Sequence, residues 1–135
     1  MGKTVSIQYF EKPVTDDEKE IATLLQKIVQ ATITKNIDLL VSVYSDTASI
    51  VNLISRHIPL NKSEYRERMS NIMENIRDIY FRDAIIRVNG QEATISCLSI
   101  ILLRDKILPE KNQRYYRCIK ENGKWSIAES RYIVF

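Results

Sequence analysis

The chain has 135 residues, of which 44% are hydrophobic and 27% are charged; these proportions are typical of a globular domain and exclude disorder, collagen-like repeats and a coiled coil. The net charge of +3 is too small to imply a nucleic-acid partner. The longest apolar run, residues 98–103, is far shorter than the ~20 residues that span a bilayer, and the N-terminus has no apolar core of secretory length. We therefore expect one cytoplasmic domain over residues 1–135, without membrane association.

The chain is predicted to open with a short strand and a long helix. Apolar and polar residues alternate over residues 4–10, which indicates an edge strand. Thr15 and Glu18 form a capping box, and apolar residues then recur at helical spacing to about residue 33. The first helix is therefore expected to begin just after Thr15.

Two shorter helices are predicted on either side of a second strand. Asn36 is placed to cap a helix over residues 37–44, and residues 48–53 have the composition of a strand. Asn61 offers another cap, and the apolar face of the helix that follows reaches about residue 76.

The C-terminal half is predicted to form a meander of four strands. From residue 79 onward the apolar period changes from 3.6 to 2. Asn89-Gly90 and Asn122-Gly123 are both signals of a two-residue type I′ hairpin turn. The strands are expected at about 79–88, 91–104, 113–121 and 124–135, with a loop over 105–112 between the hairpins.

Two-residue turns also predict which residues face one another across the strands. The expected pairs are Val88 with Gln91, Ala84 with Ile95, Glu121 with Lys124, Cys118 with Ile127, Tyr115 with Ser130 and, if the middle loop is symmetric, Cys97 with Cys118.

Helices followed by a long antiparallel sheet indicate an α+β fold, in which three N-terminal helices pack on one face of a curved, mostly antiparallel sheet. Alternation divides the strands into two apolar sets, and three helices can cover only one. We expect the helices to cover the set with Phe81, Ile85, Leu98, Ile100, Leu102, Tyr115, Ile119, Ala128, Ser130, Tyr132 and Val134, together with Asp83 and Arg117. The other set is expected to form a homodimer through the outer sheet face, with Tyr80, Arg82, Ile95, Cys97, Tyr116, Cys118, Trp125, Ile127 and Glu129.

Two segments resemble motifs of the nuclear transport factor 2-like (NTF2-like) superfamily. Residues 35–50, KNIDLLVSVYSDTASI, are similar to its pattern G-D-x-D-x-x-x-x-x-[YF]-x-D-D-A-x-[VI], with departures at Lys35, Asn36 and Thr47. Residues 121–127, ENGKWSI, are similar to its x-x-G-K-W-x-I. The resemblance implies an α+β cone, commonly dimeric, with a pocket between helices and sheet. Isomerases, dehydratases, cyclases and non-catalytic binding proteins all share this scaffold.

Ketosteroid isomerase is the member of that superfamily whose catalytic residues are easiest to check in a sequence. It needs a carboxylate base, a tyrosine and a protonated aspartate. The resemblance places Asn52, Ile28 and Tyr115 at those positions. An amide does not accept a proton as a base does, and isoleucine donates no hydrogen bond. This argues against steroid-type proton transfer, although whether the chain is an enzyme at all stays open.

Other catalytic candidates each have a structural alternative. His57, the single histidine, could act as a base near neutral pH or simply be solvated in its loop. Asp83 with Arg117 could bind a polar ligand or form an ion pair at the sheet margin. Tyr115 could hydrogen-bond a ligand or be a core tyrosine. Cys97 and Cys118 are expected to be buried small hydrophobes, and no metal site or cofactor is predicted.

Three functions are therefore compatible with the sequence. The first is a non-catalytic dimer that binds a small apolar molecule in a pocket, lined by Ile28, Asn52, Phe81, Leu98, Ile100, Tyr115, Ser130 and Tyr132. The second is an acid–base enzyme on a small apolar substrate, with His57 or Asp83 as base and Tyr115 as donor. The third is a protein-interaction module with a filled interior.

Overall fold

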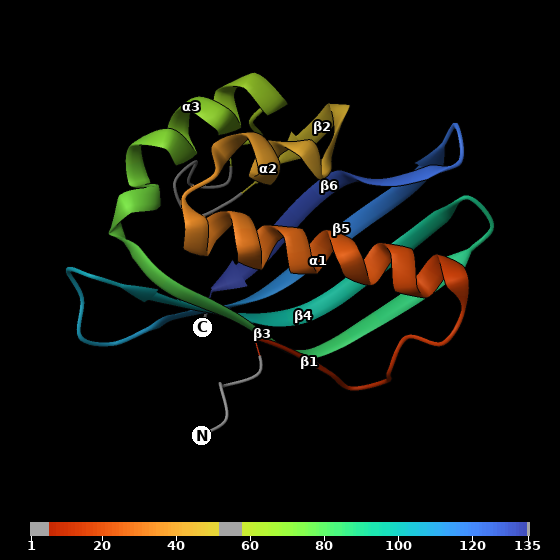
Figure 1. Ribbon diagram of the computed structural model, residues 1–135, viewed down its shortest axis with the longest axis horizontal. Helices are drawn as coiled ribbons and strands as arrows, with labels where there is room; N and C mark the ends of the chain where they lie inside the picture. The colour runs from red at the N-terminus through yellow and green to blue at the C-terminus, as the bar shows by residue number, and fades with distance from the viewer. Residues whose placement is uncertain (1–5, 52–57, 135) are drawn as a thin grey trace.

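The computed structural model describes residues 6–51 and 58–134. Three α-helices pack on one face of a curved six-stranded sheet with the strand order β1-β3-β4-β5-β6-β2 (Figure 1). The strands β3 to β6 are antiparallel neighbours, whereas β1 and β2 pair in parallel with β3 and β6 at the two edges. The elements are β1 Ile7–Tyr9, α1 Asp16–Thr34, α2 Ile37–Ser42, β2 Tyr44–Ile50, α3 Lys62–Ile72, the 3₁₀ turn η1 Met73–Asn75, β3 Ile76–Asn89, β4 Glu92–Leu103, β5 Glu110–Glu121 and β6 Lys124–Val134. The predicted α+β class is confirmed.

All three predicted helix caps are confirmed. The side chains of Thr15, Asn36 and Asn61 accept hydrogen bonds from backbone N–H groups one turn into α1, α2 and α3, at 3.1, 3.1 and 2.8 Å. The boundary after α2 differs from the prediction, because β2 begins at Tyr44 and not at residue 48. Tyr44 pairs with Ile127 of β6, a contact between distant segments that local propensity does not contain.

The turn between β5 and β6 and the predicted pair of Cys118 with Ile127 are confirmed, but Tyr115 lies opposite Arg131 and not Ser130, because β6 has one extra residue at Ala128. Glu121 pairs with Lys124, and Asn122 and Gly123 have φ angles of 52° and 77°. Positive φ at both central positions is the requirement of a type I′ turn.

The hairpin between β3 and β4 turns one residue later than predicted. Asn89 pairs with Glu92, so Gly90 and Gln91 are the central residues. Gly90 has a φ of 65°, whereas the φ of Gln91 is not positive. A positive φ at the first central residue alone is the pattern of a type II′ turn. The predicted pairs of Val88 with Gln91 and Ala84 with Ile95 are therefore wrong.

The register between β4 and β5 also differs from the prediction. Cys97 lies opposite Arg114, and Cys118 lies opposite Ala93, because the connection between these strands, residues 104–109, is shorter than the symmetric loop assumed. The shift is an even number of residues, so both cysteines still face the same side of the sheet.

Two β-bulges reverse the alternation of side chains within strands. One lies in β3 between Arg82 and Ile85, where Asp83 has a φ of 53°. The other lies in β6 at Ala128, since Cys118 pairs with Ile127 but Arg117 pairs with Glu129. An extra residue on one strand moves every later side chain to the opposite face.

The helices cover the set of residues that was expected to form the outer face. Six of the predicted dimer residues are 0–4% exposed and belong to the core beneath the helices: Ile95, Cys97, Tyr116, Cys118, Trp125 and Ile127. Strand alternation from these residues places Leu98, Ile100, Leu102, Tyr115 and Ile119 on the open face. Both sets are apolar, so the strands alone did not indicate which one the helices would choose.

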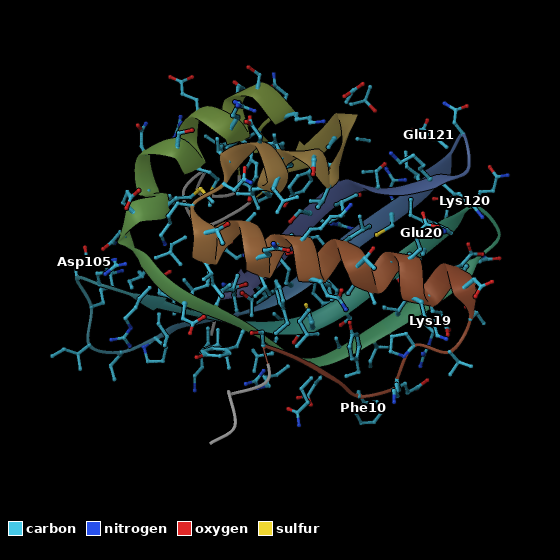
Figure 2. All side chains as sticks on the ribbon, viewed as in Figure 1. Phe10, Lys19, Glu20, Asp105, Lys120 and Glu121 are labelled. Atoms are coloured by element: carbon cyan, nitrogen blue, oxygen red, sulfur yellow. The ribbon has the colours of Figure 1, made fainter. Side chains whose placement is uncertain are left out.

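The N-terminal end of α1 is fastened to the β5–β6 hairpin. The Trp125 indole N–H and the Lys120 ammonium donate to the same oxygen of Asp17 at 2.9 and 3.0 Å. The backbone N–H of Trp125 donates to Glu20 at 3.0 Å. Figure 2 shows Glu20 and Lys120 at this end of the molecule, opposite the loop that carries Asp105. These contacts hold the N-terminal end of α1 against the hairpin, and α1 crosses the sheet from there (Figure 1).

Candidate functional site

A cavity of about 270 Å³ lies between the helices and the inner face of the sheet. Its volume is close to the lower end of ligand pockets, ~300 Å³. Side chains from α1, α2, α3, β2, β3, β4 and β5 contribute to its lining, which consists of Ile28, Thr32, Leu40, Tyr44, Tyr65, Met69, Ile72, Asn75, Ile76, Ile79, Phe81, Ser99, Ile101, Leu103, Glu110, Arg114 and Tyr116.

Most of this lining is apolar. Ile28 belongs to the buried stripe of α1, and Ile79 and Phe81 alternate on the inner face of β3. Met69 completes the wall from the side of α3. A small molecule in the cavity would therefore contact mainly hydrocarbon, with a few polar groups to orient it.

Arg114 is the cationic side chain of the cavity. Its Nε is buried without a hydrogen-bond partner among the described residues, and the side chain as a whole is partly buried and belongs to the lining of the cavity. The guanidinium carbon lies 5.9 Å from the ring centre of Tyr116 and 5.8 Å from that of Tyr132. Burial is the largest influence and acts to lower the pKa of Arg114, whereas attraction to the ionised forms of Tyr116, Tyr44, Tyr65 and Cys97 raises it, and the pKa lies above its usual value. Those ionised forms exist only at high pH, so at neutral pH they give the guanidinium no counter-charge. With its pKa above the usual value, this guanidinium stays charged.

Three tyrosines with protonated hydroxyls surround this charge. Tyr44 and Tyr65 meet edge to face, with ring centres 5.1 Å apart. Burial is the largest cause that raises the pKa of Tyr44, Tyr65 and Tyr116. Neutral phenols are hydrogen-bond donors and weak acceptors, so they supply polarity here without supplying a counter-charge to Arg114.

Further polar groups without partners lie on the inner face near Arg114. Ser99 and Asn112 are fully buried, and neither the Ser99 hydroxyl nor the Asn112 amide has a hydrogen-bond partner among the described residues. The two residues are direct partners across β4 and β5. The buried hydroxyl of Ser130 also has no partner in the described part of the chain. Such groups are uncommon in folded proteins and call for an explanation.

Two of the sequence-predicted pocket residues line the cavity. Ile28 and Phe81 do so, and Ser130 and Tyr132 lie buried on the same face of the sheet without being part of the lining. Alternation places Leu98 and Ile100 on the opposite face, and their neighbours Ser99 and Ile101 line the cavity instead. The bulges in β3 and β6 are the reason that the predicted set is divided in this way.

The predicted polar candidates do not come together. Tyr115 points away from the helices with 42% of its surface exposed, because Arg114 and Tyr116 on either side of it face the cavity. Asp83 is exposed at the bulge of β3. Arg117 forms ion pairs with Glu92 and Glu129, both at 3.4 Å. The prediction that Asp83 and Arg117 face the helices is wrong.

Two further candidates, Asn52 and His57, lie outside the described residues. Of the predicted dimer residues not in the core, Tyr80, Arg82 and Glu129 are partly exposed. Tyr80 donates a hydrogen bond to Asp78 at 2.7 Å, and the guanidinium of Arg82 lies 5.1 Å from the ring centre of Tyr80.

Sequence reasoning missed Arg114, Tyr44 and Tyr65. The sequence did contain a signal for Arg114. In the run Arg114-Tyr115-Tyr116-Arg117, strand alternation places Arg114 on the same face as Tyr116 and on the opposite face from Tyr115. Once the core position of Cys118 is known, counting back along β5 places Tyr116 and Arg114 on the inner face. Tyr44 was expected to be the last residue of a helix and is instead the first residue of β2.

None of the helices within residues 6–51 and 58–134 combines the length and the apolar character needed to cross a membrane. In the same part of the chain, His, Cys, Asp and Glu side chains nowhere gather into a group that could hold a metal ion.

Comparison with known proteins identifies the fold. Neither the models of protein families nor the curated proteins give a match to this sequence. Among solved structures, a candidate calcium/calmodulin-dependent protein kinase II association domain from Xanthomonas campestris superposes with a TM-score of 0.78 at 14% identity, over 98% of both chains. A protein of unknown function with a cystatin-like fold from Nostoc punctiforme gives 0.75 at 18% identity, over 92% of this chain and 96% of the other.

A candidate dehydratase from the NTF2-like family of Streptomyces avermitilis gives a TM-score of 0.74 at 16% identity, over 88% of this chain and 96% of that one. Similarity at this level of identity establishes a shared fold and leaves function open.

Proposed function

We propose that this chain, which has the NTF2-like fold, is a homodimeric protein that binds a small molecule in the cavity between its helices and its sheet, without catalysing a reaction on it. The observation that carries this proposal is a cavity of about 270 Å³ whose apolar walls surround a few buried polar groups. That combination is typical of small-molecule sites. The expected location is the cytoplasm, and the two buried cysteines, both free thiols, suit a reducing compartment.

The groups around the cavity favour binding over acid–base catalysis. Glu110 borders the cavity, but it is held in an ion pair with Lys106 at 2.7 Å. Burial keeps the hydroxyls of Tyr44, Tyr65 and Tyr116 protonated, so none of them is poised as a base. These groups can orient a ligand, and an apolar ligand gains its affinity from the hydrocarbon around it.

Binding is tested with a neutral apolar probe and variants that fill the cavity. Octan-1-ol is titrated into the protein by calorimetry, alongside native mass spectrometry of the freshly purified protein. The Ile28→Trp side chain would occupy the cavity, and we expect it to abolish binding of the alcohol. Ile33→Trp changes an exposed residue of the same helix and should leave binding unchanged.

Overpacking can also destabilise the fold, so circular dichroism accompanies each variant. Ile72→Trp, at a partly buried position of the lining, serves as the second cavity-filling variant. Equal binding by the wild type and a folded cavity-filling variant would refute the site. So would the absence of both a retained molecule and any bound alcohol.

The dimer is proposed through the open face of the sheet. Leu98, Ile100 and Leu102 lie on this face, and the exposed Tyr115 and Ile133 lie on the neighbouring strands. Ion pairs of Glu129 with Arg117 and Arg131, at 3.4 and 3.3 Å, flank the apolar residues. An apolar centre with a charged border is how stable interfaces are built.

Sedimentation at micromolar concentration tests this interface. The wild type is expected to be a dimer, and Ile133→Glu is expected to yield monomers because it buries a carboxylate in the interface. Ile107→Glu changes a fully exposed isoleucine of the β4–β5 loop and should remain dimeric. A monomeric wild type would refute the dimer and would favour the alternative of an interaction module for another protein.

A further inference from the structure

We propose, on the premise of the binding function above, that the ligand of the cavity is a small apolar acid whose carboxylate is held by Arg114. The cavity would then recognise one monoanionic carboxylate at its sheet side and a hydrocarbon body among the isoleucines of α1, β3 and β4. Three observations support this: a cation without a counter-ion, hydrogen-bond donors without acceptors beside it, and an apolar remainder of the lining.

The charge of Arg114 is not neutralised by the described part of the protein. No described carboxylate lies within 4.0 Å of its guanidinium, and Glu110, the described carboxylate of the lining, pairs with Lys106 instead. Because Arg114 belongs to the lining of the cavity, an anion bound in the cavity could lie next to this charge. A buried charge is costly unless it is paired, and an anion in the cavity would remove that cost.

Contacts with aromatic rings do not replace a counter-ion here. The guanidinium lies 5.9 and 5.8 Å from the ring centres of Tyr116 and Tyr132, close to the ~6 Å limit at which cation–π attraction is effective. The rings therefore hold the guanidinium in position and leave its N–H groups available. Five N–H donors in a planar fork match the two oxygens of a carboxylate.

Donors without partners among the described residues lie close to Arg114 on the inner face of the sheet. Ser99 lines the cavity, and Asn112, which is fully buried behind the lining, pairs with Ser99 across β4 and β5, so their Cβ atoms are about 5 Å apart. Asn112 and Arg114 are two positions apart on the inner face of β5, about 7 Å along the strand. The Ser99 hydroxyl and the Asn112 amide are both without partners among the described residues. A carboxylate oxygen has enough lone pairs to accept from more than one of these donors.

The balance of charge favours a carboxylate over a phosphate. Among the described lining residues Arg114 is the one cation, and Glu110, four positions earlier on β5, is the one anion. One guanidinium neutralises one negative charge, whereas a phosphate monoester carries close to two at pH 8 and would bring an uncompensated charge into the cavity.

Matched probes separate this inference from the binding function itself. Straight-chain acids from hexanoate to decanoate are titrated at pH 8 against the alcohols of the same length and against octyl phosphate. Hydrogen bonds to a charged group contribute about 1.5–3 kcal/mol, so the best acid should bind about 10- to 100-fold more tightly than its alcohol. Octyl phosphate should bind more weakly than octanoate.

Variants of two arginines on the same strand show whether Arg114 is responsible. Arg114→Gln keeps a polar side chain and should reduce acid binding about 10- to 100-fold while changing alcohol binding far less. Arg114→Lys keeps the charge without the planar fork and should bind acids with intermediate affinity. Arg117→Gln, on the opposite face and ion-paired there, should bind both classes as the wild type does.

The possible outcomes differ for the two proposals. Alcohols that bind as tightly as their acids, or acid binding that survives Arg114→Gln, would overturn the carboxylate site and leave the binding function standing. Failure of every acid and every alcohol to bind would overturn both. An acid preference that is lost in Arg114→Gln and kept in Arg117→Gln would establish the site.

Discussion

Replacing Arg114 by methionine should make the protein more stable while removing its affinity for acids. Arg114 is partly buried, and an unpaired charge costs up to several kcal/mol when it is fully buried. The two ring contacts, at 5.9 and 5.8 Å, return about 0.5–1 kcal/mol each. Methionine is neutral, unbranched and of adaptable shape. We therefore expect the free energy of unfolding to rise by roughly 1–3 kcal/mol.

Urea denaturation in the absence of added ligand measures this difference, because the midpoint should rise while the slope stays unchanged. Arg117→Met is the matched control, since it removes exposed ion pairs that contribute at most ~1 kcal/mol. Saturating octanoate should stabilise the wild type and not Arg114→Met. If Arg114→Met instead lowers the free energy of unfolding by more than about 1 kcal/mol, Arg114 is a structural residue and our reasoning about its uncompensated charge fails.

Three further predictions concern stability and reactivity. Hydrogen bonds from Trp125 and from Lys120 lower the pKa of Asp17. This carboxylate therefore stabilises the fold above its unfolded-state pKa, and the contribution is lost as the pH falls through its folded-state pKa. In Asp17→Asn, the free energy of unfolding should consequently decrease less between pH 6 and pH 2 than it does in the wild type. Gly123→Ala should lower the free energy of unfolding by about 1 kcal/mol in urea, because φ is 77° at this turn position, and an unchanged midpoint would contradict the turn assignment. Burial raises the pKa of Cys97 and of Cys118 to about 12. Iodoacetamide at pH 8 should therefore leave both thiols unmodified in the native protein and alkylate both in urea, as measured by mass spectrometry. Rapid labelling of the native protein would show that the strands open.

Local chemistry allowed much of the fold to be predicted from the sequence. Thr15, Asn36 and Asn61 begin helices because their side chains satisfy N–H groups only a few residues away. The turn at Asn122-Gly123 forms because few other residue pairs accept positive φ twice. Such features depend on neighbours along the chain, and so they can be inferred without knowing the tertiary structure.

Only the tertiary structure decided which face of the sheet the helices cover. Both faces of β3 to β6 are apolar, and the choice depended on how α1 docks on the sheet, where Asp17 meets Trp125. The bulges at Asp83 and Ala128 then exchanged residues between the faces. The candidate site follows from these long-range events: Arg114 reaches the cavity, and Tyr115 does not, because a strand presents alternate residues to opposite sides and packing sets the side that is buried.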